Sequence, residues 1–301
     1  MAGVAWPIIG TDTQSPCRGR RGEAIRRRAS DMTLTDVFSK DLFAGKHVFV
    51  TGGGSGINLG IAKSFAALGA KIAICGRSQE RLDGAAGELR ALGAEVFAQS
   101  ADVRDYAALE SAIEGARGAL GSMSTLVCGA AGNFPAAAEA LSSNGFKSVI
   151  DIDLLGSFNA ARAAFPQLKE TKGSIVFVSA GQAFSPHPMQ AHVGAAKAGV
   201  DMLMKDLAVD WAKYGIRSNS VVPGPIDDTE GMRRLAPARG GKENVAKLVP
   251  LGRLGHVDDI GGVAAFLASP LASYITGTVL VCDGGTNLLG SGMWFSLMMG
   301  T

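Results

Sequence analysis

The chain has 301 residues, of which 47% are hydrophobic and 19% are charged. That is enough apolar material for one large core, and single α/β domains often reach this length. The formal net charge of +2 excludes a field strong enough to make nucleic-acid binding a main role. No uninterrupted apolar run approaches the roughly 20 residues that a membrane-spanning helix needs. We therefore expect one soluble domain without a membrane span and without a nucleic-acid partner.

The cysteines indicate a reducing compartment. They lie scattered along the chain, without the CxxC or Cys/His spacing of a metal site, at Cys17, Cys75, Cys128 and Cys282. Most of them end short apolar runs, which is typical of buried free thiols in a reducing environment. We expect a cytoplasmic protein with no metal. The apolar C-terminal stretch "SGMWFSLMMGT" carries no Ser-Lys-Leu address.

The N-terminal stretch differs in composition from the rest of the chain. The segment "CRGRRGEAIRRRASD" is rich in arginine and precedes a second methionine, Met32. This composition fits a transit peptide. A disordered extension, or a start assigned too early, fits as well, because no apolar face accompanies the arginines. We expect a disordered extension over 1–31 and a single domain over 32–301.

From Lys46 onward, short β-branched runs alternate with Ala-rich segments of helical period, as in a parallel sheet covered on both faces. The pattern predicts strands at 46–51, 71–76, 95–100, 124–129, 173–179, 216–222 and 277–283. It predicts helices at 56–68, 79–92, 105–119, 142–169, 190–213 and 257–268. The one long connection, 223–255, is charged, rich in proline and glycine, and contains a short helical piece, "EGMRRLA". We expect a lid there, at about 226–250.

A glycine cluster follows the first predicted strand and opens the first predicted helix, in "VFVTGGGSGINLG". Such a turn lets the backbone approach a pyrophosphate, whose charge the helix N-terminus favours. A tight turn without a ligand is the alternative, but the strand–turn–helix context favours a dinucleotide. Asn58 stands where the usual spacing has its last glycine, which implies an altered turn or a side-chain contact to cofactor or substrate. The expected cofactor contacts are Gly52, Ser55, Gly56, Ile57 and Asn58.

The end of the second predicted strand indicates which dinucleotide binds. The stretch "AICGRSQER" contains Arg77 and has no carboxylate before Glu80. An acidic residue here would bind the ribose 2′-hydroxyl, whereas a basic one binds a 2′-phosphate, so we expect NADP(H). An exposed arginine at a helix start is the alternative for Arg77. After the third strand, Asp102 and its neighbour Val103 are expected at the adenine edge, with a helix cap as the alternative for Asp102.

Several stretches together resemble the short-chain dehydrogenase/reductase family over roughly residues 40–286. They are "TGGGSGI", "ADVRD", "LVCGAAGNF", "RSNSVVPGPI" and "ASYITGTVLVCDGG". The resemblance implies an α/β, doubly wound Rossmann-type fold with a seven-stranded parallel sheet and helices on both faces, and a homotetramer. It also implies cofactor contacts in the loops after the fourth and sixth strands, from Ala130, Ala131, Gly132, Pro223, Gly224, Ile226 and Thr229.

The catalytic positions depart from the family's usual Asn, Ser, Tyr and Lys. This chain has Asp153, Ala180, Val193 and Lys197 there, so only the lysine remains. The stretches "AAGNF", "DIDLLGSFN" and "QAHVGAAKAGVD" look like the peroxisomal-type 2,4-dienoyl-CoA reductases, which also lack the serine and the tyrosine. In that group an aspartate in the Asn position works with the lysine. The resemblance therefore implies NADPH-dependent reduction of 2,4-dienoyl-CoA in fatty-acid degradation, with Asp153 and Lys197 as catalytic residues.

Under this resemblance, Asp153 and Lys197 would polarise a water that protonates carbon after hydride transfer, and Lys197 would also bind the nicotinamide ribose. A dienoyl thioester needs its proton on carbon, whereas a ketone needs an acid beside its oxygen. Two alternatives remain open. One is a reductase of the same fold acting on another CoA-linked, carrier-linked or carbonyl substrate, and the other is an inactive NADP-binding protein.

Further side chains are candidates for an acyl-CoA substrate. Asn133 and Phe134 are expected to line the pocket, although an asparagine there often only forms a turn. Arg233 and Arg234 in the lid are expected to bind the CoA phosphates, which suit guanidinium groups, with simple exposure as the alternative. His192 adjoins the missing tyrosine, but neighbours on a helix point in different directions, so we interpret it as structural.

Overall fold

The computed structural model of the chain describes residues 33–235 and 240–290. The described residues from 34 onward belong to one compact unit. The Arg-rich extension expected over 1–31, Cys17 and the apolar C-terminal stretch lie outside the described residues. The expectations for those segments, and the division of the chain into an extension and one domain, stay predictions.

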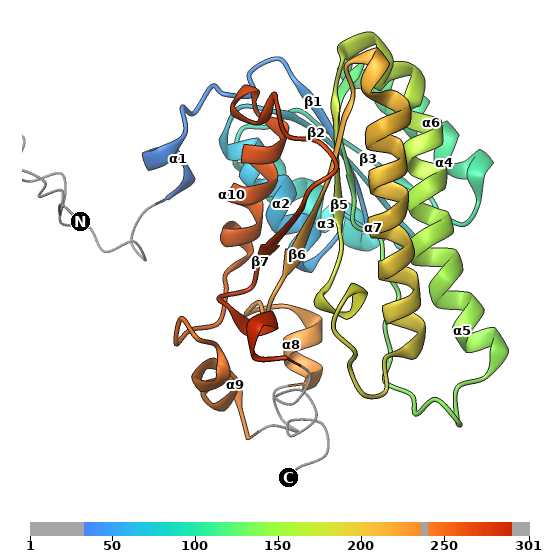
Figure 1. Cartoon of the computed structure of the whole chain (residues 1–301). Helices are drawn as coiled ribbons and strands as arrows, with labels where there is room; N and C mark the ends of the chain where they lie inside the picture. Colours follow the sequence, from blue (N-terminus) through green and yellow to red (C-terminus); the bar gives the residue numbers. More distant parts are fainter. Residues whose placement is uncertain (1–32, 236–239, 291–301) are drawn as a thin grey trace, which may run out of the picture. The chain divides into compact units, whose positions relative to one another are not determined.

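In the described residues, seven parallel strands form one sheet in the order β3-β2-β1-β4-β5-β6-β7 (Figure 1). They are β1 (His47–Thr51), β2 (Lys71–Gly76), β3 (Val96–Ser100), β4 (Met123–Cys128), β5 (Ser174–Val178), β6 (Arg217–Pro223) and β7 (Val279–Cys282). β1 and β5 are buried at every residue, whereas β3 and β7 at the edges are partly exposed. Each strand overlaps a predicted one, so the predicted α/β fold is confirmed.

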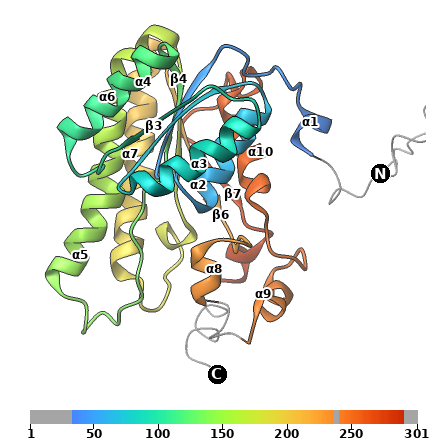
Figure 2. The same cartoon turned by 180° about the vertical axis from the view of Figure 1, so that it is seen from behind.

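Helices cover both faces of the sheet, and Figure 2 shows α2 and α3 lying over the strands. One apolar core joins one face to α2 (Gly56–Ala67), α3 (Gln79–Ala91) and α10 (Val257–Ala268). A second core joins the other face to α4 (Tyr106–Leu120), α6 (Gly156–Thr171) and α7 (Ala191–Trp211). The shorter helices are α1 (Leu34–Val37), α5 (Ser143–Val149), α8 (Glu230–Leu235) and α9 (Lys242–Leu248). Short 3₁₀ turns are η3 (Gly181–Ala183), η4 (Ala212–Tyr214), η6 (Pro270–Ala272) and η7 (Thr286–Leu289).

The strand order reverses between β1 and β4. From β1 the chain continues outward to β2 and β3, and it then returns to the other side of β1 as β4. In open parallel sheets, ligands bind in the crevice that such a reversal leaves at the carboxyl ends of the strands. The glycine turn follows β1, and the predicted cofactor contacts at 130–132 follow β4. The sheet therefore brings both predicted segments to one crevice.

A π-helical turn, η2 (Ile150–Leu155), lies inside the long helix predicted over 142–169. The chain runs from α5 through η2 into α6, which passes close to the loop after β3. A Cβ added at Gly156 would lie 2.5 Å from Cγ2 of Val103, so residue 156 must be glycine for this approach. The predicted helical stretch over 142–169 is thus confirmed, but the π turn around Asp153 was not predicted. Single π turns are rare and occur frequently at functional sites.

The long connection after β6 contains α8 at the predicted helical piece, and also α9, which the sequence pattern did not predict. A parallel bridge between Ile226 and Gly255 joins the two ends of this segment. The role of the segment as a lid stays a prediction.

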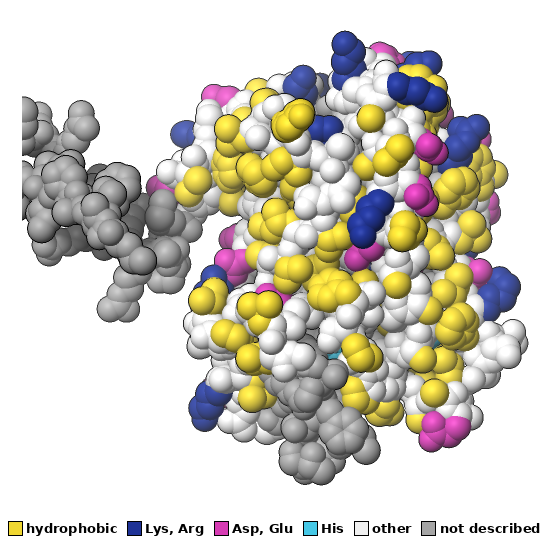
Figure 3. All heavy atoms as spheres, viewed as in Figure 1, with side chains coloured by type: hydrophobic (Ala, Val, Ile, Leu, Met, Phe, Trp, Pro, Cys, Tyr) yellow, Lys and Arg dark blue, Asp and Glu magenta, His cyan; other side chains and the backbone are white. Residues whose placement is uncertain are grey.

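No helix in the described part of the chain is both long and apolar enough to cross a membrane. On the face shown in Figure 3, basic and acidic side chains are interspersed among hydrophobic ones. This mixture agrees with the formal net charge of +2.

Candidate active site

The glycine turn lies between the end of β1 and the start of α2. Gly52 and Gly56 have φ angles of +70° and +58°, in the left-handed region that favours glycine. A Cβ at Gly52 would lie 2.9 Å from the Cα of Ala130 in the loop after β4. Ser55, the N-cap of α2, makes no side-chain capping hydrogen bond in the described chain, and Ile57 follows it in the first turn. The N–H groups at this helix start suit an anion.

Asn58 and Thr51 connect the glycine turn to the end of β4. Nδ2 of Asn58 donates to the carbonyl of Gly129 at 2.7 Å and to that of Gly52 at 3.4 Å. Oγ1 of Thr51 accepts a hydrogen bond from the N–H of Gly129 at 3.0 Å. The side-chain contact expected at Asn58 is thus made to protein carbonyls in this structure. Thr51 was not singled out from the sequence; its signal is a threonine at a buried strand end directly before the glycines.

The predicted cofactor residues after β2 and β3 lie beside each other. Arg77 is exposed at the end of β2, where Ser78 is the N-cap of α3. Asp102 forms an ion pair with Arg104 at 2.6 Å, and this guanidinium holds the pKa of the Asp102 carboxyl below its usual value, with a smaller contribution in the same direction from Arg77. The alternative of Asp102 as a helix cap is wrong, because Asp105 is the N-cap of α4.

The structure brings Asp153 and Lys197 together, from η2 and α7. Their Oδ2 and Nζ atoms lie 3.1 Å apart, and the two residues are 0% and 6% exposed. Oδ1 of Asp153 accepts a hydrogen bond from the N–H of Gly132 at 2.7 Å. Nζ of Lys197 donates to the carbonyl of Val178, at the end of β5, at 3.0 Å. Backbone groups therefore supplement the ion pair, which a buried pair requires.

One oxygen of this pair faces only the ammonium. Oδ2 of Asp153 is buried 3.1 Å from Nζ of Lys197, outside good hydrogen-bond geometry, and accepts from no other described residue. The charge of the carboxylate is therefore compensated at this oxygen by Lys197 alone. Oδ2 retains acceptor capacity beyond the ion pair.

The position usually held by the tyrosine is filled by packing. Val193 is buried against Val149 of α5 and Ala196 of α7. His192, next to it, is also buried, and its ring lies 4.5 Å from the ring of Phe134. No described residue supplies a phenol at this place, because the side chain of residue 193 belongs to an apolar cluster. Both ring nitrogens of His192 are buried without a hydrogen-bond partner among the described residues, so its structural role stays a prediction.

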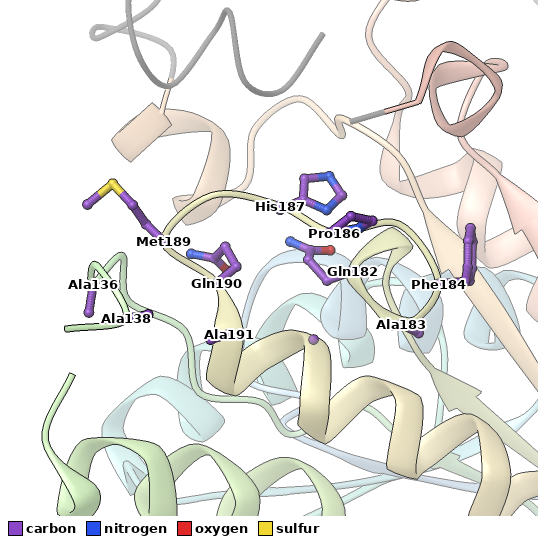
Figure 4. A pocket seen from close by; sticks show the side chains of 11 residues that line it. Ala136, Ala138, Gln182, Ala183, Phe184, Pro186, His187, Met189, Gln190 and Ala191 are labelled. Carbon is purple, nitrogen blue, oxygen red and sulfur yellow. The ribbon is translucent and has the colours of Figure 1, made fainter. Parts of the chain in front are cut away.

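A cavity of about 480 Å³ lies at the N-terminal end of α7 (Figure 4). The loop after β4 and the segment between β5 and α7 line it, with Ala136, Ala138, Gln182, Ala183, Phe184, Pro186, His187, Met189, Gln190, Ala191 and Gly194. Gly194 lies one helical turn before Lys197 on α7. The N–H of Ala136 donates to the carbonyl of Met189 at 3.0 Å and so joins the two segments. Most of this lining was not predicted from the sequence, because small and apolar loop residues carry no distinctive pattern.

The predicted substrate residues lie in the loop after β4 and on α8. Asn133 and Phe134 are exposed in the loop after β4, but neither lines the cavity. Arg233 is exposed on α8, and its Nη1 lies 3.5 Å from the carbonyl of Asp228. The side chain of Arg234 is outside the described residues. No contact in the described residues joins Arg233 to Asn133 or Phe134, so their roles toward a substrate stay predictions.

The loop after β6 carries the remaining predicted cofactor residues. Ile226 is buried, and Thr229 Oγ1 donates to its carbonyl at 2.9 Å and accepts from the N–H of Met232 at the start of α8. A Cβ at Gly224 would lie 2.5 Å from the Cα of Asp283, so this loop passes directly over the turn after β7. The hydroxyl of Thr229 thus contributes to the start of α8.

No group of His, Cys, Asp or Glu side chains in the described residues could hold a metal ion.

Comparison with known proteins gives the family to which the chain belongs. Residues 52–287 match the family model described as Enoyl-(Acyl carrier protein) reductase. The chain belongs to the short-chain dehydrogenase/reductase family. It is thus an oxidoreductase of the short-chain dehydrogenase/reductase type.

Relatives within the short-chain dehydrogenase/reductase family include the peroxisomal 2,4-dienoyl-CoA reductase of Saccharomyces cerevisiae. The two sequences are 48% identical over an alignment that covers 83% of this chain and 87% of the length of the yeast protein. A probable 2,4-dienoyl-CoA reductase of Bacillus subtilis is 40% identical over 80% of this chain and 96% of its own. An NADPH-bound short chain oxidoreductase from Pseudomonas aeruginosa PAO1, described as containing an atypical catalytic center, has a TM-score of 0.76 and 31% identity, over 81% of this chain and 97% of its own. The predicted resemblance is confirmed.

Asn58→Ala should destabilise the protein and weaken cofactor binding. The substitution removes the donor to the Gly129 carbonyl, and an unsatisfied buried carbonyl costs about 1–3 kcal/mol. Urea unfolding should show a loss of that size, and fluorescence titration should show weaker NADPH binding. Asn244→Ala, an exposed amide on α9, is the control and should change neither quantity. Unchanged stability in Asn58→Ala would contradict the role of the Asn58 amide in joining the glycine turn to the end of β4.

Proposed function

We propose that this chain is an NADPH-dependent reductase of 2,4-dienoyl-CoA thioesters in fatty-acid degradation. The observation that carries the proposal is the buried pair of Asp153 and Lys197, in which one carboxylate oxygen faces only the ammonium, in a site where Val193 replaces the phenol. The names of the yeast and Bacillus relatives support the same substrate class.

The chemistry explains why a phenol is unnecessary. In a conjugated dienoyl thioester, hydride adds at the far end of the conjugated system and negative charge spreads toward the thioester, so the proton is needed on carbon. Asp153 and Lys197 would orient a water that delivers this proton, with Oδ2 of Asp153 as the acceptor that holds it. The ammonium stabilises both the carboxylate and the developing negative charge.

The residues at the strand ends fit a dinucleotide. The glycine turn, Asn58 and the start of α2 would hold the pyrophosphate, and Lys197 the nicotinamide ribose. NADPH, when bound, supplies the hydride. Arg77 favours the 2′-phosphate, since the sequence after β2 has no carboxylate before Glu80. The NADPH-bound relative from Pseudomonas supports the same choice.

The cavity at the start of α7 suits the acyl part of the substrate. Its lining contains no Lys, Arg, Asp or Glu among the described residues, and apolar cavities of some 300–1,000 Å³ are typical ligand sites. Asn133 and Phe134 would lie along the acyl thioester, and Arg233 and Arg234 would contact the CoA phosphates. The second candidate substrate is a thioester on acyl carrier protein, which the description of the family model favours.

We also propose a homotetramer. The outer face of α7 exposes Met202 and Val209, at 57% and 77%, although the same helix packs on the sheet. A helix that is apolar on more than one face needs a second partner.

For the cellular compartment, the sequence predicts the cytoplasm, whereas the yeast relative is named peroxisomal. Imaging of the tagged full-length chain distinguishes the two locations.

Asp153→Asn and Lys197→Met should each reduce kcat for 2,4-dienoyl-CoA at least 100-fold, because each removes a charge that orients the proton donor. NADPH oxidation by the purified protein measures this. Asp151→Asn is the matched control, because Asp151 lies on the same π turn but pairs with Lys147 at the surface, and it should retain activity. Equal activity in Asp153→Asn, or turnover of ketones alone, would contradict the proposal.

Arg77→Asp should shift cofactor preference from NADPH toward NADH. A charge-assisted hydrogen bond to the 2′-phosphate contributes about 1.5–3 kcal/mol, so the NADPH/NADH ratio of kcat/KM should fall roughly 10- to 100-fold. Arg90→Gln, at the other end of α3, should leave the ratio unchanged. An unchanged ratio in Arg77→Asp would remove Arg77 from the cofactor site.

Light scattering after size exclusion should give the mass of four chains of 30.9 kDa. Met202→Lys and Val209→Lys together should give smaller particles, because charged side chains are costly in an apolar interface. A monomer in the unsubstituted protein would contradict the tetramer.

A further inference from the structure

The loop after β4 runs from the catalytic carboxylate to the cavity at the start of α7. At one end, the N–H of Gly132 donates to Oδ1 of Asp153 at 2.7 Å. Farther along, the N–H of Ala136 donates to the carbonyl of Met189 at 3.0 Å, and Ala136 lines the cavity. Even a fully extended chain between residues 132 and 136 spans at most about 14 Å. This wall of the cavity therefore begins within reach of an acyl chain held at the catalytic pair.

An aromatic contact holds the loop between these two hydrogen bonds. The ring of Phe134 lies 4.5 Å from the ring of His192, in the first turn of α7. Its Cζ edge packs on Gly145 of α5, where an added Cβ would lie only 3.2 Å away. The loop is thus attached to η2, to α7 and to the segment before α7, so the position of the cavity wall is fixed by the fold.

The wall that this loop contributes is made of alanine side chains. Ala136 and Ala138 line the cavity, whereas Ala137 between them does not. Residues 131–137 have no helical or strand hydrogen bonding, and successive side chains of an extended segment point to opposite sides. Two methyl groups therefore face the cavity, and a third side chain of the same kind lies between them in the sequence but outside the lining.

The opposite wall carries larger side chains. Phe184, Pro186 and Met189 line the cavity from the segment between β5 and α7 (Figure 4). Met189 has a φ angle of +62°, in the left-handed region that residues other than glycine rarely adopt. Such a conformation persists only where the surroundings hold it. Here its carbonyl accepts the hydrogen bond from Ala136, so the two walls are joined, and the side chains on the alanine wall set the free width.

The chemistry of the proposed substrate says what this width must hold. In a 2,4-dienoyl thioester the conjugated system ends at the fifth carbon, so a hexadienoyl chain has one carbon beyond it and a decadienoyl chain has five. These further carbons are saturated and apolar. Each CH₂ that moves from water into an apolar cavity strengthens binding about fourfold. A cavity without Lys, Arg, Asp or Glu in its described lining suits this part of the chain.

We infer that Ala136 and Ala138 are specificity-determining residues, which set the acyl chain length that the site accepts. Their small side chains leave room for an unbranched saturated chain beyond the diene, so the favoured ligands are thioesters of medium-length acyl groups. A leucine at either position would fill part of the cavity and exclude the far carbons, while shorter chains would still fit. The inference rests on the proposed function for the diene, but not for the apolar chain that follows it.

Binding of saturated acyl-CoAs tests the inference without turnover. Calorimetric titration of the NADPH-loaded protein gives Kd for hexanoyl-CoA and decanoyl-CoA, and the unsubstituted protein should bind decanoyl-CoA roughly tenfold or more tightly. Ala136→Leu and Ala138→Leu should each remove most of this preference, with Kd for hexanoyl-CoA within about twofold. Ala137→Leu is the matched control and should retain the preference, because residue 137 does not line the cavity.

Two binding results would overturn the inference. One is a Kd ratio for the two thioesters that is the same in the unsubstituted protein and in both leucine variants. The other is a loss of preference in Ala137→Leu as large as in the two variants of the lining. Unfolding midpoints show that each variant is folded, and Ala136→Val or Ala138→Val replaces a leucine variant that is not.

Kinetics with 2,4-hexadienoyl-CoA and 2,4-decadienoyl-CoA give a second result. In Ala136→Leu and Ala138→Leu, kcat/KM for the longer substrate should fall roughly tenfold, mainly through KM, and kcat/KM for the shorter one should change little. An unchanged preference in both variants would also overturn the inference. Failure of the unsubstituted protein to reduce either dienoyl-CoA would refute the proposed function instead, while the binding of the saturated thioesters would still decide the role of the two alanines.

Discussion

The buried ammonium of Lys197 is the group around which the catalytic end of this reductase is organised. Removing a lysine charge from water costs several kcal/mol unless opposite charge and hydrogen-bond acceptors replace the lost hydration. Here the carbonyl of Val178 and the carboxylate of Asp153 replace it. Each of these partners comes from a different element, so the position of one charge depends on β5, η2 and α7 together.

The surrounding fold supplies these partners through close backbone contacts. The parallel sheet brings the ends of β1, β4 and β5 to one edge. Thr51 and Asn58 join the first two of these ends, and the loop after β4 then directs the N–H of Gly132 at Asp153. The π turn carries Asp153 into this loop. Among the described residues the place of the phenol is taken by Val193, and the site retains a buried carboxylate paired with an ammonium.

Much of the fold was predictable because its signals are local. Runs such as "VFVT" and "SIVFV" are apolar on both faces, as buried parallel strands must be. The π turn around Asp153 was not predicted, because a π turn leaves no mark on hydrophobic periodicity. α9 was missed because a short helix in a polar segment has little period to detect. The partners of Asn58 depend on a contact between residues far apart in the chain.

The candidate site was predictable only through family resemblance. Spacing along the sequence gives no indication that residues 153 and 197 meet, since they lie on separate elements. The small and apolar residues that line the cavity likewise lack a sequence signature.

The most direct test of a solvent-derived proton is to run the reaction in D₂O with unlabelled NADPH and to locate deuterium in the product by NMR. The proposed mechanism predicts one deuterium on a carbon of the acyl chain nearer the thioester, and unlabelled hydride at the far end of the former diene. An alcohol product, or a carbon that gains no deuterium from the solvent, would contradict the role assigned to Asp153 and Lys197.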